Sequence, residues 1–356
     1  MARLFIPGPT DVAAEILQAQ THPMIGHRSR DCDELIARIQ PRLRQVLQTR
    51  QRVFITASSG SGLQEASLRN LVTERVLCCV CGAFGERWHE VAVGNGIPAD
   101  RLDAEWGEPN RPEEIVRALR AGRFDTLAVV HNETSTGVEN PVAEIAARAR
   151  EVQPDLLLLV DAVSSAGGVD LRTEEWGLDV VLTSSQKCFA LPPGLAFAAV
   201  SDRALEKARH VPRRGWYFDF LLLEEYLNKN TTPATPAISL LFALDAQLDR
   251  ILAEGLPARF ARHARMAAMT QAWGEPIFGL LAAAGSRSRS MTALRNPRSL
   301  DAAALNAHLA RWQMSIADGY GRLKGKSLRI AHMGEIMPAD LELLFARIDD
   351  YLRTHP

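Results

Sequence analysis

Two apolar segments that each end on a polar residue constrain the fold of this chain more than any other feature. The run at 156–160 ends on Asp161, and a second run at 180–182 leads into TSSQK, whose last residue is Lys187. Short continuous apolar runs bounded by turn residues are typical of buried strands in a parallel sheet. Open sheets of that kind bind ligands at the carboxyl ends of their strands. We therefore expect Asp161 and Lys187 to face one ligand site.

Strand-like and helix-like segments alternate between residues 52 and 201. Strands are expected at VFITA, VLCCVCG, RLDAEW, TLAVVHNE and LAFAAVS, in addition to the two opening runs. Helices are expected at LQEASLRNLV, FGERWHEVAVGNG, PEEIVRALRAG and VAEIAARAREV, after an amphipathic helix over 31–48. This alternation favours an α/β fold, in which a mostly parallel sheet carries helices on both faces.

The two ends of the chain follow other patterns. Residues 1–20 are expected to form an extended arm followed by a short helix with Asp11 at its N-cap. After about residue 206 comes a polar, proline-marked loop, and then a long amphipathic helix from about Ser239. We expect an N-terminal arm over 1–20, a large domain over 21–245 and a smaller α+β domain over 246–356.

Composition excludes several kinds of protein. The 356 residues are 47% hydrophobic and 23% charged, which is ordinary for a soluble globular protein. The net charge of -1 gives no bulk electrostatic reason to bind nucleic acid or a membrane surface. No apolar run approaches the ~20 residues of a membrane span, and MARLFIPGPT lacks the apolar core of a secretion signal. A cytoplasmic protein with no nucleic-acid and no membrane partner is expected.

The five cysteines are expected to be free thiols. Their number is odd, and three of them lie in the apolar run VLCCVCG, which has the pattern of a buried strand. Metal ligands would be spaced across turns and joined by histidines, and none are placed in that way. We therefore expect no metal site.

A glycine-rich loop is the first candidate for binding a phosphate. Residues 58–62, SSGSG, lie between an expected strand and an expected helix. Such a loop presents backbone N–H groups and hydroxyls at a helix N-terminus, where anions bind. It matches neither GxGxxG nor the Walker A motif, so taken alone it is also compatible with a plain tight turn.

Together with Asp161 and Lys187, this loop suits pyridoxal 5'-phosphate. That cofactor requires a lysine for a Schiff base, a carboxylate on its pyridine nitrogen and an anion cradle for its phosphate. The lysine must supply a neutral amine, which burial favours by lowering its pKa. Once released, the same amine can move a proton at the substrate carbon.

Along the chain, further motifs occur in this order: PGPT at 7–10, PMIGHRS at 23–29, SSGSG, GAFGERW at 82–88, HNETSTGV at 131–138, VDAVSSAGG at 160–168, SSQK at 184–187, PPG at 192–194 and LRIAHMG at 328–334. With this ordered set the chain resembles the class V aminotransferases of pyridoxal-phosphate fold type I, and most of all the serine–pyruvate and alanine–glyoxylate aminotransferase group. The resemblance implies a seven-stranded type of sheet, a smaller C-terminal domain and a homodimer with active sites at its interface.

The resemblance also implies a role for individual residues. Lys187 is the Schiff-base lysine, and Asp161 is the partner of the pyridine nitrogen. Arg329 pairs with the α-carboxylate of the substrate, for which a planar guanidinium is suited. The remaining cofactor contacts are Ser59, Gly60, Ser61 and Gln186 at the phosphate, Phe84 and Val163 on the ring, and Thr134 near the phenolic oxygen.

Two further segments are implied to reach the site from a distance. The loop TTPATP at 231–236 would cross the dimer interface to the neighbour's phosphate, with Thr235 as the first candidate and Thr232 as the second. Gly8 and His27 would line the substrate entrance. His27 is otherwise a solvated loop histidine.

The function implied is a two-step amino transfer from alanine or serine to glyoxylate or pyruvate, and no second cation is clearly placed for a dicarboxylate. Other class V activities remain as alternatives: a phosphoserine or ureidoglycine type of transaminase, a lyase, or an interaction subunit associated with a hydrogenase. Gln186 stands where desulfurases and related lyases carry a histidine, and no cysteine follows Cys188 on a mobile C-terminal loop. Intact Lys187, Asp161 and Arg329 argue against a non-catalytic subunit.

Overall fold

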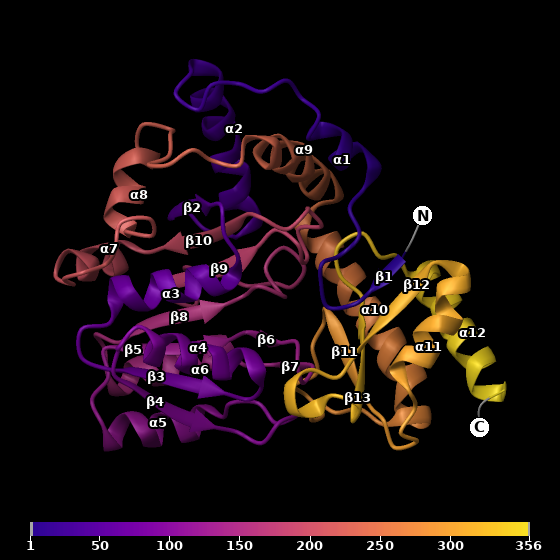
Figure 1. Cartoon of the computed structure of the whole chain (residues 1–356). Coiled ribbons are helices and arrows are strands. Elements are labelled where there is room, and N and C mark those ends of the chain that lie inside the picture. The colour runs from indigo at the N-terminus through magenta and orange to yellow at the C-terminus, as the bar shows by residue number, and fades with distance from the viewer. Residues whose placement is uncertain (1–2, 355–356) are drawn as a thin grey trace.

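A seven-stranded sheet forms the centre of the larger domain in the computed structural model, which describes residues 3–354 (Figure 1). Its strands are β2 (Arg52–Thr56), β3 (Val76–Val80), β4 (Ala99–Asp103), β5 (Thr126–Val130), β8 (Leu157–Asp161), β9 (Val180–Ser184) and β10 (Ala196–Val200). They lie in the order β2-β10-β9-β8-β5-β3-β4, and all run parallel except β10. The predicted mostly parallel sheet is confirmed.

Helices cover both faces of this sheet, which explains the continuous apolar runs of its strands. On β8, Leu158 and Val160 join the core on one face, whereas Leu157 and Leu159 join the core on the other. The first face carries α2 (Arg30–Val46), α5 (Pro112–Ala121), α6 (Val142–Val152) and α9 (Ile238–Glu254). The second face carries α3 (Gly60–Leu71), α4 (Ala83–Gly94), α7 (Asp202–Arg209) and α8 (Phe220–Leu227).

The smaller domain is built on a four-stranded mixed sheet. The strands are β1 (Arg3–Phe5), β11 (Met291–Arg295), β12 (Met314–Asp318) and β13 (Ser327–Ala331), in the order β1-β12-β13-β11. They pack against α10 (Leu256–Phe278), α11 (Ala302–Leu309) and α12 (Pro338–Thr354) through a third core. Among the described residues, no helix is both long enough and apolar enough to cross a membrane.

The N-terminal segment contributes a strand to the smaller sheet. Its strand β1 pairs in parallel with β12 and so forms part of the sheet of the C-terminal domain. The helix that follows, α1 (Ala14–Ala19), is not capped by Asp11, because that carboxylate instead accepts a hydrogen bond from the backbone N–H of Leu4. A pairing between segments about 300 positions apart leaves no periodic signal in either segment.

The segment predicted as a polar loop after residue 206 contains the helix α8. Its first backbone N–H groups are satisfied by Asp219, which accepts from Leu221, and by Asn70, which accepts from Phe220. Phe220 and Leu223 are buried in the core beneath α3. This short helix depends on caps and packing from distant residues, so its own sequence predicted it poorly.

All five cysteines are buried and carry free thiols, as predicted. Cys78 and Cys79 lie within strand β3, and Cys81 directly follows it. Burial raises the pKa of Cys78 to about 12, so its thiol stays protonated and serves as a small apolar side chain.

Candidate active site

The carboxyl ends of β8 and β9 lie side by side and bring the two opening residues together. Asp161 is the last residue of β8 and pairs with Leu182 of β9. The turn that carries Lys187 begins at Ser185, three positions after Leu182. A cavity of about 140 Å³ lies at this edge, and both side chains line it. The same cavity is lined by seven more of the residues singled out from the sequence: Ser59, Gly60, Ser61, Phe84, Thr134, Val163 and Gln186.

The carboxylate of Asp161 is buried and held in one orientation. One oxygen accepts from the backbone N–H of Val163 at 2.9 Å, and the other accepts from Nε2 of Gln64 at 2.7 Å. Burial raises the pKa of Asp161 to about 6, although these hydrogen bonds and the positive charges of Lys187 and Arg87 act in the opposite direction. The carboxylate is therefore ionised at neutral pH and poised to take a cationic partner.

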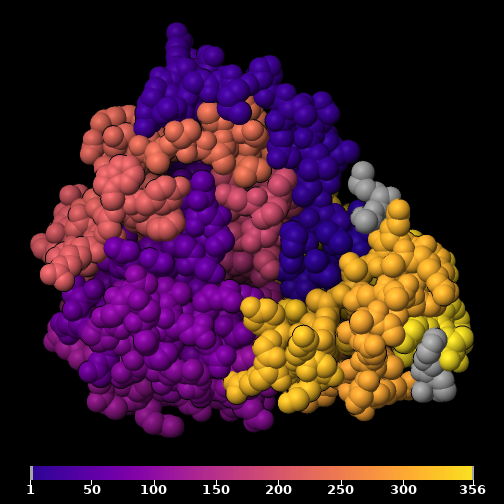
Figure 2. Space-filling view, in the orientation of Figure 1, coloured from indigo at the N-terminus to yellow at the C-terminus, as the bar shows by residue number. Residues whose placement is uncertain are grey.

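Lys187 is enclosed by the N-terminal segment. Its Nζ donates to the carbonyl oxygen of Pro7, and a Cβ added at Gly8 would lie 2.7 Å from that same nitrogen. Thr10 fastens the segment to the turn, since its N–H donates to Gln186 O and its Oγ1 donates to Lys187 O. Figure 2 shows this indigo segment lying between the two domains. Gly8 is thus required by its close approach to the lysine.

Burial and the positive charge of Arg329 lower the pKa of Lys187 to about 8. About a tenth of the amine is then neutral at pH 7, far more than for an exposed lysine. This environment favours a lysine that acts as a nucleophile or a base.

The first turn of α3 forms the anion-binding side of the cavity. Ser59 precedes the helix in an extended conformation, and the first helical N–H groups have no intrahelical acceptor. A Cβ at Gly60 would lie 2.4 Å from Cγ2 of Val163, so only glycine lets this turn pack against the β8 end. Backbone donors and two serine hydroxyls therefore meet at the cavity wall.

Several polar atoms around the cavity have no partner within the described chain. They are Gln64 Oε1, Asn132 Oδ1, Ser184 Oγ and Gln186 Oε1. Buried polar groups in folded proteins nearly always find a hydrogen-bond partner. A cavity with one carboxylate, one amine and these open acceptors and donors fits a polar, phosphorylated aromatic ligand such as pyridoxal phosphate.

Phe84 is presented to the cavity by a helix whose start is fixed from another loop. Glu133, which is fully buried, accepts from the backbone N–H groups of Phe84 and Gly85, each at 3.0 Å. The hydroxyl of Ser135 accepts from Ala83 N and donates to Glu133. Burial raises the pKa of Glu133, and the hydrogen bonds from Ser135 and Gly85 limit the rise without cancelling it.

We expect Glu133→Ala to lower the free energy of unfolding by about 2–4 kcal/mol, because it leaves several buried N–H groups without an acceptor. Urea unfolding of the apoprotein measures the change. Glu133→Gln is the matched comparison: its amide oxygen can still accept from α4, and it removes a buried charge, so we expect a loss of less than half that size. Equal losses in the two variants would contradict this account.

Arg329 lies beside the cavity on β13 of the smaller domain. Its side chain is 8% exposed, so it is not a solvated arginine on a surface strand. Its Nε donates to Asp318 O at 2.8 Å and its Nη1 donates to Thr134 O at 3.3 Å. Burial lowers the pKa of Arg329, yet a guanidinium stays charged in neutral solution. It is a fixed cation next to Lys187, joined to no carboxylate of the described chain.

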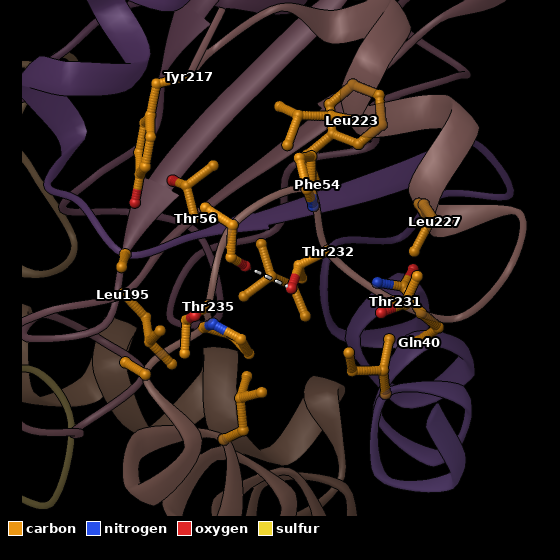
Figure 3. A pocket seen from close by; sticks show the side chains of 18 residues that line it. Gln40, Phe54, Thr56, Leu195, Tyr217, Leu223, Leu227, Thr231, Thr232 and Thr235 are labelled. Atoms are coloured by element: carbon orange, nitrogen blue, oxygen red, sulfur yellow. Dashed lines mark hydrogen bonds between the residues drawn. The ribbon is translucent and has the colours of Figure 1, made fainter. Parts of the chain in front are cut away.

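Two of the expected residues lie apart from this cavity. His27 is in the loop before α2 and does not line it. Thr235 lines a second, largely apolar cavity together with Thr56 and Leu195, and Thr232 there donates to Ala234 O at 2.7 Å (Figure 3). None of the side chains that line this second cavity is charged.

Three residues near the cavity were not identified from the sequence. Gln64 follows Gly60 by four positions on α3, and Arg87 follows Phe84 by three on α4, so helical spacing places each pair on one face. That spacing was the signal from which Gln64 and Arg87 could have been predicted to lie near the cavity. Tyr320 comes from the loop after β12 and stacks on Phe84, with 5.5 Å between ring centroids. Nothing in its local sequence indicates this contact.

The larger domain has an open, mostly parallel sheet that presents a lysine, a carboxylate and a hydroxyl-rich helix N-terminus at one edge. Together with the smaller α+β domain beside it, this arrangement defines the fold type I class of pyridoxal-phosphate-dependent enzymes. The family model described as aminotransferase class-V matches residues 16–294. The chain belongs to this family and is a pyridoxal-phosphate-dependent aminotransferase.

Known proteins resemble the chain over nearly its whole length. It is 36% identical over 347 residues to a protein named soluble hydrogenase, small subunit, from a Synechococcus species, covering 96% of this chain and 90% of that protein. It is 35% identical over 347 residues to the L-aspartate–glyoxylate aminotransferase of Paracoccus denitrificans, covering 94% and 87%. The structure of an alanine–glyoxylate aminotransferase from a Nostoc species matches with a TM-score of 0.92 at 31% identity, covering 99% and 96%.

Proposed function

We propose that this chain binds pyridoxal phosphate in the cavity at the ends of β8 and β9 and transfers an amino group from a small amino acid to glyoxylate or pyruvate. The observation that carries the proposal is the pairing of a lysine of lowered pKa with a buried carboxylate in one cavity. Glyoxylate as acceptor is supported by the names of two of the similar proteins. Alanine and serine are the proposed donors.

Each role in cofactor binding is assigned to a group already described. Lys187 would bond the aldehyde carbon, and Asp161 would pair with the pyridine nitrogen. Ser59, Gly60, Ser61 and Gln186 would hold the phosphate, and Phe84, Val163 and Thr134 would contact the ring and its phenolic oxygen. When bound, the cofactor supplies an electron-withdrawing ring that stabilises negative charge at the substrate's α-carbon.

The chain's own residues then bind the substrate and move its protons. Arg329 would hold the α-carboxylate, because its guanidinium is fixed by two carbonyls and has no carboxylate partner in the described chain. Lys187, displaced by the substrate's amine, would take the proton from the substrate's α-carbon and return it to the former aldehyde carbon of the cofactor. Pro7 O and Gly8 would keep the amine near that position.

We propose that two copies of the chain assemble with their sites at the interface. In that dimer the loop 231–236 would reach the partner's cofactor phosphate, through Thr235 or, failing that, Thr232. His27 would border the substrate entrance. A cytoplasmic location also stays a prediction.

The alternative of a hydrogenase-associated subunit draws support from the name of one similar protein. The cavity nevertheless keeps its lysine, its carboxylate and its open polar atoms, which a purely structural subunit would not need. We therefore favour the enzyme over this alternative and over a lyase.

We expect the purified holoprotein to form glycine from glyoxylate when alanine or serine is supplied. Alanine or serine alone should convert the bound cofactor to its amine form, which a change in its visible absorption reports. Glycine is measured by chromatography over time, with D-alanine as the matched control donor. An absorption band that does not change with any small L-amino acid would overturn the proposal.

A further inference from the structure

One guanidinium in the cavity is not used by the proposed function. Arg87 lies on α4, one helical turn after Phe84, and its half-buried side chain lines the cavity wall. Within residues 3–354, no carboxylate lies within ion-pairing distance of it. Its chain neighbour Glu86 instead pairs with Arg101 at 3.4 Å and with Arg322 at 3.7 Å. A partly desolvated cation with no carboxylate within ion-pairing distance is suited to an anionic ligand.

Tyr320 connects Arg87 with the arginine proposed for the α-carboxylate. Nη2 of Arg87 donates to the Tyr320 hydroxyl at 3.1 Å, and the guanidinium carbon of Arg329 lies 5.5 Å from the centroid of the same ring. The ring also stacks on Phe84 with an interplanar angle of 16°. Two cations, one from each domain, therefore contact one phenol beside the cavity.

The orientation of Arg87 is fixed, and it leaves donors available. Its guanidinium carbon lies 5.0 Å from the Phe84 ring centroid, and its Nη1 is 3.4 Å from Ser61 Oγ. A guanidinium has five N–H donors, and Arg87 uses two of them, one to Ser61 Oγ and one to the Tyr320 hydroxyl. The Tyr320 hydroxyl accepts from Arg87 and so retains its own proton to donate. A carboxylate placed here would be bound by both side chains.

We propose that Arg87, with Tyr320, binds a carboxylate on the substrate's side chain, so that the site takes dicarboxylic amino acids of the aspartate class as donors. The assignment rests on the proposed function, in which Arg329 holds the α-carboxylate. Because the two guanidiniums contact one tyrosine, they can hold both carboxylates of one small molecule. The sequence showed no second cation clearly placed for a dicarboxylate, since Tyr320 joins Arg87 to Arg329 only in the fold.

The other anion that Arg87 could bind is the cofactor's phosphate. Arg87 makes two hydrogen bonds, and the one to Ser61 Oγ on α3 is the longer, at 3.4 Å. The shorter one joins Arg87 to Tyr320 of the smaller domain. The geometry therefore favours the substrate's carboxylate over the cofactor's phosphate as the anion that Arg87 binds. Measuring the affinity of an Arg87 variant for the cofactor distinguishes the two possibilities.

The test compares the holoprotein with Arg87→Gln, Tyr320→Phe and the control Arg322→Gln, which removes a charge beside the same loop but outside the cavity. Donor efficiency, as kcat/KM, is measured for aspartate and for alanine with glyoxylate as acceptor. Calorimetry gives the dissociation constants of succinate and propionate, which have no amino group to transfer. The dissociation constant of pyridoxal phosphate is measured for each apoprotein.

Arg87→Gln should lower kcat/KM for aspartate and weaken succinate binding by about 10- to 100-fold, the usual effect of losing a charge-assisted hydrogen bond. The kcat/KM for alanine and the dissociation constants of propionate and pyridoxal phosphate should change by less than about threefold. A change of that size is too small for the loss of a charge-assisted contact. Tyr320→Phe should show the same selectivity with a smaller loss, and Arg322→Gln should match the wild type.

Equal losses for both donors together with weaker cofactor binding would overturn the proposal and assign Arg87 to the phosphate. An Arg87→Gln variant that keeps its full preference for succinate over propionate would also overturn it. A wild-type protein that transfers from no donor, but binds succinate in an Arg87-dependent manner, would reject the proposed function and support the dicarboxylate site.

Discussion

Replacing Lys187 by alanine is expected to lower the turnover number for amino transfer by about 10⁴-fold or more. The amine is proposed both to bond the cofactor and to move the α-proton, and general acid–base catalysis alone contributes about 10²–10⁴. The loss should be accompanied by the disappearance of the covalently bound, visible-absorbing cofactor. Stopped-flow absorbance and a glycine assay measure the two effects on one preparation.

Lys187→Arg is the informative comparison, because it keeps the positive charge but cannot act as a nucleophile. It should be as inactive as Lys187→Ala. In the wild type, the rate at which the apoprotein takes up pyridoxal phosphate should rise through about pH 8, where Lys187 loses its proton, rather than near 10.5. Substantial transfer activity in either variant would contradict the assignment of the lysine.

Asp161→Asn is expected to lower kcat by about 10²–10³-fold while making the apoprotein more stable at neutral pH. An asparagine has nearly the same shape but carries no charge, so it cannot stabilise a proton on the pyridine nitrogen. Removing one preorganised electrostatic contact typically has an effect of this size. Alanine–glyoxylate transfer measured at saturating cofactor isolates the effect on kcat.

The stability change follows from the pKa of Asp161, which is raised from 3.8 to about 6 in the folded chain. Between these values the folded state binds more protons than the unfolded state, so this carboxyl lowers stability as the pH rises through that window. Above pH 6 its ionised form destabilises the empty fold, and Asp161→Asn should add about 1–3 kcal/mol. Urea unfolding at pH 7 measures this gain. An Asp161→Asn apoprotein that is less stable than the wild-type apoprotein at pH 7 would contradict the predicted gain.

Much of the site could be predicted because its residues follow strands or begin helices. Asp161 and Lys187 each follow an apolar run, and parallel neighbouring strands end at one edge. Gly60 begins a helix after β2, so the loop 58–62 reaches the same edge. For these residues, local pattern and sheet topology together determine position.

Other contacts could not be predicted, because they join segments without local signals. The Arg87–Tyr320 contact spans 233 positions and depends on how the two domains meet. The enclosure of Lys187 by Pro7 spans 180 positions and depends on β1 entering the C-terminal sheet. Helix α8 was missed for a related reason, since Asn70 of α3 satisfies its first N–H.

The periodicity of apolar residues was sufficient to establish the α/β class, the mostly parallel sheet and the edge where Asp161 and Lys187 meet. Packing decided the rest. It buried Asp161 and Lys187 enough to move their pKa values toward neutrality, and it left Arg87 and Arg329 without carboxylate partners among the described residues. Burial and charge pairing depend on three-dimensional distance, which residue order does not encode locally.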